Sequence, residues 1–97
     1  MQGLERLTNL TVLDVSNNRI GRAEGLHTLR KLEDLWLNDN DVQSTDLLQH
    51  DLASQKHSLT CIYLSGNPIV QEKGRMYRKW LKASLPALKQ IDADTLQ

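Results

Sequence analysis

The sequence predicts an α/β solenoid, in which short parallel strands line a concave face and helices or turns cover the convex face. Three observations lead to this fold class: one spacing of apolar residues occurs three times, the copies follow one another at similar intervals, and a helical pattern follows the last copy. Each copy fits Leu-x-x-Leu-x-Leu-x-x-Asn-x-Leu, with Val or Ile at some positions, which is the leucine-rich-repeat consensus. The copies occupy residues 10–20, 32–42 and 59–69.

The segments that lead into the first two copies are repeated as well. Residues 3–7 and 25–29 share the pattern Gly-Leu-x-x-Leu, and Asn18 and Asn40 lie 22 residues apart. This interval lies within the length of about 20–29 residues that is typical of the repeat. Asn67 of the third copy follows after 27 residues, so the second repeat is longer than the first.

The additional length predicts a helix on the convex side. Leu47, Leu48 and Leu52 have near-helical spacing, and Ser44 or Thr45 before them suits a helix N-cap. In the strands, alternation directs the leucines of Leu-x-Leu into the core and the intervening residues onto the opposite face.

The asparagines of the consensus fall where the chain leaves each strand. A buried amide at this point can donate to and accept from backbone groups that would otherwise be unpaired. We therefore expect Asn18, Asn40 and Asn67 to form a structural ladder.

A C-terminal capping helix is predicted after Asn67-Pro68. Tyr77, Trp80, Leu81 and Leu85 follow at helical intervals until Pro86, and Leu88-x-x-Ile91-Asp92 resembles a last short strand. We expect one domain over residues 1–97, with repeats at about 3–24, 25–51 and 52–69 and a cap at 70–97. Because no amphipathic cap precedes Leu4, we expect further repeats or another chain at this end, where an unpaired first strand also favours self-association.

Composition excludes several classes of function. Twelve Lys and Arg residues balance twelve Asp and Glu residues, so no overall charge attracts nucleic acid or an anionic membrane. Cys61 is the single cysteine, and the N-terminus lacks the features of a secretory signal, which predicts a cytoplasmic or nuclear protein. No apolar stretch approaches the roughly 20 residues of a membrane span.

The outward positions of the three strands predict a surface for a protein partner. Superposition of the copies aligns Asp14 with Trp36 and Tyr63, and aromatic residues at outward positions are frequent interface anchors. Glu33 and Asp34 lie shortly before Trp36 in the sequence. The alternative is that Trp36 and Tyr63 pack on each other without a ligand.

Charge is unevenly distributed along the chain. Six acidic residues and no Lys or Arg lie between Glu33 and Asp51, so a partner of the concave face is expected to be basic. Five basic residues and no acidic one lie between Lys73 and Lys82, and these charges are what the solvated face of an amphipathic helix requires. We predict no nucleic-acid contact there.

No catalytic, cofactor-binding or metal site is predicted. Asp39-x-Asp41 resembles the start of a calcium loop, but the loop's glycine and final glutamate are missing. His57 and Cys61 have no second pair of ligands, and no acid, base and nucleophile converge on one face. We therefore expect a protein that is not an enzyme.

The sequence resembles the leucine-rich-repeat regulatory subunit of protein phosphatase 1 known as regulatory subunit seven. The resemblance rests on four segments: LTNLTVLDVSNNRI, KLEDLWLNDNDV, IYLSGNPI and the cap YRKWLKASLPALKQIDA. It implies that a concave row of acidic and aromatic residues binds the phosphatase catalytic subunit. The positions that match this row are Asp14, Asp34, Trp36 and Tyr63.

The sequence departs from this family in two respects, and two other functions remain as alternatives. Family members carry a much longer array, and Asp34 stands where the family tends to have Glu. Similar caps occur in ciliary and spliceosomal leucine-rich-repeat proteins and similar repeats in tubulin-associated chaperones, so a scaffold of such a complex is one alternative. The other is a purely structural cap of a longer solenoid.

Overall fold

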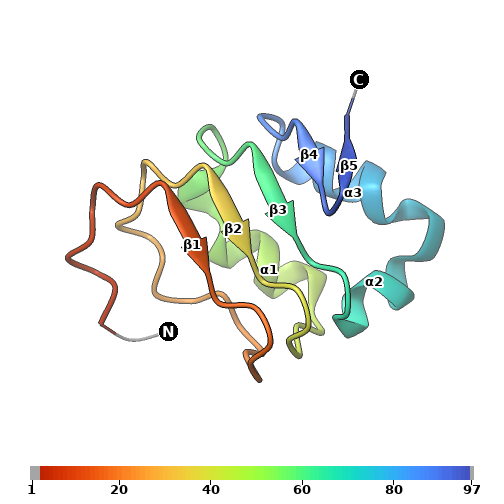
Figure 1. Cartoon of the computed structure of the whole chain (residues 1–97). Helices are drawn as coiled ribbons and strands as arrows, with labels where there is room; N and C mark the ends of the chain where they lie inside the picture. The colour runs from red at the N-terminus through yellow and green to blue at the C-terminus, as the bar shows by residue number, and fades with distance from the viewer. Residues whose placement is uncertain (1–2, 97) are drawn as a thin grey trace.

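The structure is a computed structural model, and it describes residues 3–96. Five strands form one sheet in the order β1-β2-β3-β4-β5, as Figure 1 shows. The strands are β1 (Val12–Asp14), β2 (Asp34–Trp36), β3 (Cys61–Tyr63), β4 (Gln90–Ile91) and β5 (Asp94–Thr95). The helices are α1 (Thr45–Asp51), α2 (Pro68–Lys73) and α3 (Tyr77–Ser84), with 3₁₀ helices at Ala53–Gln55 and Gly74–Met76.

The first four strands are parallel and their register follows the repeat. Leu13, Leu35, Ile62 and Ile91 form one row across the sheet, and all four are buried. Their neighbours in each strand point to the opposite face because side chains alternate along a strand. The expected parallel sheet is confirmed, and the last short strand expected within residues 88–92 is observed as β4, which is limited to Gln90–Ile91.

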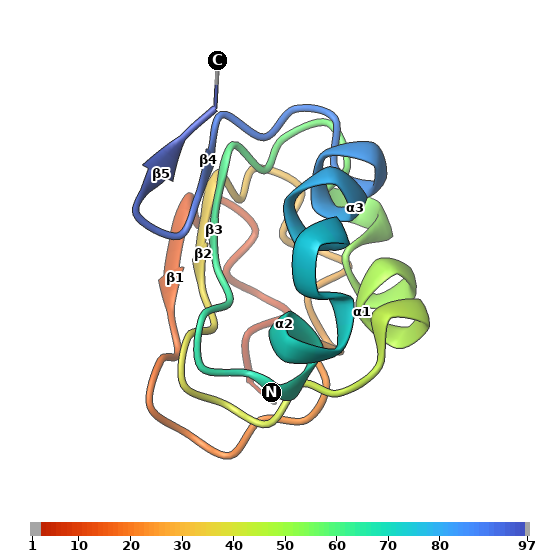
Figure 2. The ribbon, with the colours of Figure 1, turned by 90° about the vertical axis from the view of Figure 1, so that its right-hand side faces the viewer.

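The molecule has two layers, seen edge-on in Figure 2. The strands form one layer, and α1, α2 and α3 lie together on the other side of the core. The consensus leucines of the second and third repeats fill the space between the layers and are almost fully buried, whereas Leu4 and Leu10 of the first repeat are partly buried and Leu7 is exposed. The sheet face that points away from the helices is called the concave face below.

Helix α1 confirms the predicted convex helix. The hydroxyl of Ser44 accepts a hydrogen bond of 3.2 Å from the backbone N–H of Leu47, which makes Ser44 the N-cap. Leu48 and Leu52 are buried, but Leu47 is 42% exposed. Leu47 differs from Leu48 because adjacent residues of a helix point in different directions.

The asparagines occupy successive turns between the strand and convex layers. Oδ1 of Asn40 accepts from the N–H of Ile20 in the previous turn, and Oδ1 of Asn67 accepts in the same way from Val42, both at 3.0 Å. Asn40 and Asn67 are buried, whereas Asn18 is exposed and donates only to carbonyls of its own turn. The expectation of a buried amide is wrong for Asn18, since no preceding turn covers it within residues 3–96.

The C-terminal cap is held to the last repeat by Asp92. One carboxylate oxygen accepts from the N–H groups of Leu64 and Ser65 at 2.8 and 2.9 Å, and the other accepts from the Tyr77 hydroxyl at 3.0 Å. Burial and the negative charge of Asp92 raise the pKa of Tyr77, so its hydroxyl stays protonated and keeps donating. The antiparallel strand β5, which the sequence pattern does not predict, completes the cap.

The change Tyr77→Phe is expected to lower the free energy of unfolding by about 1–2 kcal/mol, because it removes a partly buried hydrogen bond to a charged acceptor and leaves the ring in place. Urea denaturation measures this difference. The slope of the unfolding free energy against urea concentration should be the same in both proteins. A variant as stable as the original chain would show that Asp92 holds the cap through its backbone contacts alone.

At the other end, β1 forms an edge of the sheet within the described residues, and self-association through this edge stays a prediction. Over residues 3–96, none of the helices has the length and apolar character needed to cross a membrane.

Candidate protein-binding site

The centre of the concave face is a pair of aromatic rings. Trp36 and Tyr63 are direct neighbours in the register of β2 and β3, and their ring centroids lie 5.0 Å apart with an interplanar angle of 35°. The two rings therefore do pack on each other, as the alternative interpretation expected. Trp36 nevertheless remains 37% exposed, so the pair presents a preformed apolar surface to solvent.

Further apolar area lies next to the ring pair. Val12 of β1 is 49% exposed, and its register neighbour in β2 is Asp34. The next residue in this row is Cys61, whose thiol is partly buried. Burial, Asp34 and Asp92 together raise the pKa of Cys61, so the thiol stays protonated and contributes a small, weakly polar surface.

Carboxylates border the aromatic pair on the side of β1 and β2. Asp14 is the register neighbour of Trp36, and its carboxylate accepts from the N–H and hydroxyl of Ser16 at 3.0 and 2.7 Å. These hydrogen bonds lower the pKa of Asp14, which keeps it negatively charged. Asp34 is half-buried in the neighbouring row, and Glu33 is exposed directly before β2. An apolar centre with negative charge on one side suits a partner that combines apolar and basic side chains.

The acidic residues of the second repeat do not all belong to this surface. Asp51 is the last residue of α1 on the convex side, where Arg22 donates two hydrogen bonds to it at 3.0 and 2.6 Å. Its side chain is only 3% exposed. Asp46 lies in the first turn of the same helix. The negative charge of the concave face is therefore smaller than the count of acidic residues between Glu33 and Asp51 suggests.

The structure adds Gln90 to this surface, a residue that the sequence analysis missed. Gln90 of β4 continues the row of Val12, Asp34 and Cys61. Its amide donates to the hydroxyl of Tyr63 at 3.1 Å. A signal was present in the sequence, because Gln90 precedes Ile91 as Cys61 precedes Ile62 in the consensus.

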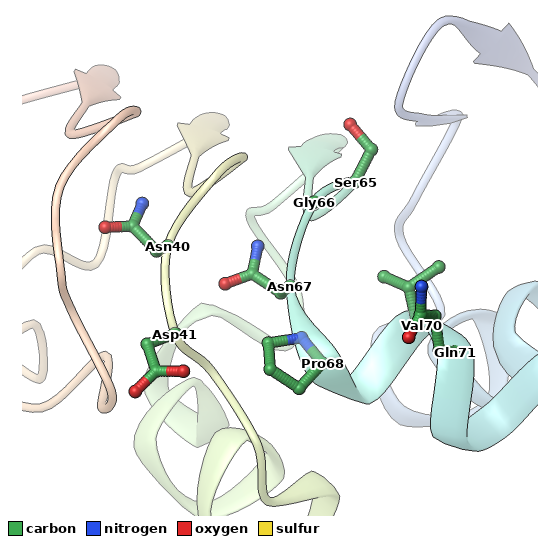
Figure 3. Close-up of a pocket in the computed structure, with 8 residues that line it drawn as sticks. All are labelled: Asn40, Asp41, Ser65, Gly66, Asn67, Pro68, Val70 and Gln71. Carbon is green, nitrogen blue, oxygen red and sulfur yellow. The ribbon is translucent and has the colours of Figure 1, made fainter.

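A polar hollow lies at the ends of the strands, between the second and third turns (Figure 3). Asn40 and Asn67 extend their amides in the same direction there, toward the preceding turn. Both amides are fully used in hydrogen bonds to the backbone. The hollow is therefore a consequence of the ladder, and its buried amides have little capacity left for a ligand.

Several basic residues in and before the cap helix α3 form contacts within the protein. Lys82 donates to the carbonyls of Pro86 and Leu88, which close the end of α3, and Arg78 pairs with Asp94 of β5. The ammonium group of Lys73 lies 5.3 Å from the ring centroid of Trp80. These contacts account for three of the five basic residues in the segment from Lys73 to Lys82.

No group of three or more His, Cys, Asp or Glu side chains within residues 3–96 is arranged to hold a metal ion.

Comparisons with known proteins agree with this architecture. A family model described as leucine-rich repeats in two copies matches residues 8–50. The chain is 38% identical over 65 residues to the protein phosphatase 1 regulatory subunit SDS22 of Schizosaccharomyces pombe, and 36% identical over 75 residues to the protein phosphatase 1 regulatory subunit pprA of Dictyostelium discoideum. These matches cover 67% and 77% of this chain but only 19% and 21% of the relatives. The chain thus spans about a fifth of the length of the curated relatives it matches.

Two solved structures share the fold. A chain of the Drosophila melanogaster SNF/U2A′ complex superposes with a TM-score of 0.75 and 28% identity, over 94% of this chain and 51% of that one. A chain of the Chaetomium Mex67:Mtr2 structure superposes with a TM-score of 0.77 and 20% identity, over 100% of this chain and 67% of that one. With its repeated strands, its buried leucines and these similarities, the chain is a leucine-rich-repeat-containing protein with an α/β leucine-rich-repeat fold.

Proposed function

We propose that this protein binds the catalytic subunit of protein phosphatase 1 through its concave face and acts as a regulatory subunit without catalytic activity of its own. The observation that carries the proposal is the ring pair of the exposed Trp36 and the half-buried Tyr63, bordered by Asp14 and Asp34. Similarity to two proteins named as phosphatase 1 regulatory subunits supports the choice of partner. Such a protein would act in the cytoplasm or the nucleus.

The geometry suits docking with little rearrangement. Each ring projects from a strand whose neighbours on both sides fix its backbone, so few residues need to become ordered on binding. The mutual packing of the rings restricts their rotation further. The rings would provide the buried anchor, and Asp14, Glu33 and Asp34 would select basic groups around it. Docking would then control the location of the catalytic subunit or its access to substrates.

A titration of the chain with purified protein phosphatase 1 catalytic subunit tests this function. Binding that is lost in a Trp36→Ala, Tyr63→Ala double variant and kept in Leu47→Ala would support the proposal, since Leu47 is an exposed apolar residue outside the concave face. If the chain does not bind, the titration should be repeated with a longer array, because the matches cover only 19% and 21% of the relatives. Absence of binding by the longer array as well would contradict the proposed partner.

A second candidate is a scaffold role in another assembly. The chain is 35% identical over 63 residues to the leucine-rich repeat-containing protein ODA7 of Chlamydomonas reinhardtii, and its fold matches a chain of the SNF/U2A′ complex. Purification of the tagged protein from cells separates the candidates, since the phosphatase catalytic subunit is expected among the bound proteins under the first proposal. If the double variant also retains all its partners in a longer array, the chain would have the role of a structural cap.

A further inference from the structure

The side chain of Gln90 in the cap strand β4 contacts the aromatic pair. Gln90 pairs in register with Cys61, which lies two residues before Tyr63 in β3. Its amide nitrogen donates to the Tyr63 hydroxyl at 3.1 Å and to the backbone carbonyl of Asp92 at 2.8 Å. The backbone of the cap therefore fixes the Gln90 amide, and the amide in turn binds the Tyr63 hydroxyl.

The Tyr63 ring is consequently fixed by two contacts of different kinds. Gln90 holds its hydroxyl, and Trp36 packs against its ring at a centroid distance of 5.0 Å. A tyrosine on an open sheet face would otherwise exchange between rotamers, and each immobilised side chain adds to the entropy lost on binding. The two contacts together remove this freedom before a partner arrives.

The support behind Gln90 extends into the cap. Asp92, whose carbonyl accepts from Gln90, also binds two backbone N–H groups at the end of β3 and the hydroxyl of Tyr77. The loop that positions the amide is thus tied both to the last repeat and to helix α3. A displacement of the cap would release Gln90 and with it Tyr63.

We propose that Gln90 is a positioning residue of the concave site, which fixes Tyr63 and, through the ring packing, Trp36 in one orientation. The inference rests on the proposed function for its consequence in binding, but the positioning itself is a property of the free protein. It also gives the cap a second role beyond covering the end of the core, since the cap orders the rings of the binding surface.

The test uses Gln90→Leu, which keeps the size of the side chain and removes its hydrogen-bonding groups, and Gln90→Glu, whose carboxylate can still accept a hydrogen bond from the Tyr63 hydroxyl. Nuclear Overhauser effects between the Trp36 and Tyr63 rings, together with rotamer averaging of Tyr63, are measured in the free protein. The exposed Gln49 on α1 offers the matched control Gln49→Leu. We expect weaker ring contacts and an averaged Tyr63 rotamer in Gln90→Leu, a smaller change in Gln90→Glu and no change in the control.

Affinity for the phosphatase catalytic subunit provides the second measurement. Gln90→Leu is expected to weaken binding about 3–10-fold, in keeping with the loss of one preordered side chain, and to have no further effect in a Tyr63→Phe background. Unchanged ring contacts in Gln90→Leu, or an equal loss of affinity in the Tyr63→Phe background, would overturn the inference. If the chain and its longer array fail to bind the catalytic subunit, the proposed function fails, and the ring measurements still decide the role of Gln90.

Discussion

Replacing Asn67 with alanine is expected to lower the free energy of unfolding by about 2–4 kcal/mol. The side chain accepts from the N–H of Val42 and donates to the carbonyls of Leu37 and Leu64, all in the buried interior. The Leu37 carbonyl keeps a second donor in Asn40, so two backbone groups lose their partner, each at about 1–3 kcal/mol. This loss is a large part of the stability of about 5–15 kcal/mol that is usual for a domain.

Chemical denaturation followed by circular dichroism measures the effect, and the chain contains its own control. Asn18 occupies the equivalent position of the first repeat but is exposed, and its amide donates only within its own turn. The change Asn18→Ala is expected to cost less than about 1 kcal/mol, because water can replace the lost partner. Equal destabilisation by the two changes would contradict the account of the asparagine ladder.

The change Trp36→Ala is expected to weaken binding to the phosphatase catalytic subunit by at least about 2 kcal/mol, or about 30-fold. The indole lies at the centre of the concave face, where a docked partner would cover the remaining exposed area. The truncation also frees the Tyr63 ring, which adds an ordering cost on binding.

Isothermal titration calorimetry of the variant measures the change, with Leu47→Ala as the matched control on the convex side. Because Trp36 packs on the surface of the sheet and its side chain is absent from the buried core, the variant should keep the fold. Retained affinity in Trp36→Ala, together with a normal circular dichroism spectrum, would remove Trp36 as the anchor.

The repeating part of the fold could be predicted from the sequence because each local pattern has one structural solution. Leu13, Leu35 and Ile62 recur at equivalent positions, and burying them in one core requires the strands to be parallel and in register. The N-cap at Ser44 and the end of α3 before Pro86 follow from local chemistry in the same way.

The contacts that the pattern could not predict are side-chain contacts between repeats that involve residues outside the consensus positions. Gln55, which has no consensus role, is fully buried and donates to the carbonyls of Leu26 and Leu29 in the preceding repeat. The pairing of Arg22 with Asp51 likewise joins residues 29 positions apart and removes one acidic group from the surface. Such pairs depend on how the turns stack, which the spacing within one repeat does not specify.

In the candidate site, too, some features follow from the sequence pattern and others do not. Alternation along the strands places Asp14, Trp36 and Tyr63 in one row, and the structure brings them together in that register. The pattern also aligns Gln90 with Cys61, but it does not specify the hydrogen bond from Gln90 to Tyr63, which depends on the conformation of the two side chains.

The central claim, that the concave face is the docking surface, is tested most directly by fluorine NMR of the chain labelled with 5-fluorotryptophan. The two tryptophans report on different surfaces: Trp36 on the concave face and Trp80 on the cap helix. On addition of the phosphatase catalytic subunit, the account predicts that the Trp36 resonance changes its chemical shift while the Trp80 resonance keeps its own. A shift confined to Trp80, or binding by calorimetry without any shift of Trp36, would contradict it.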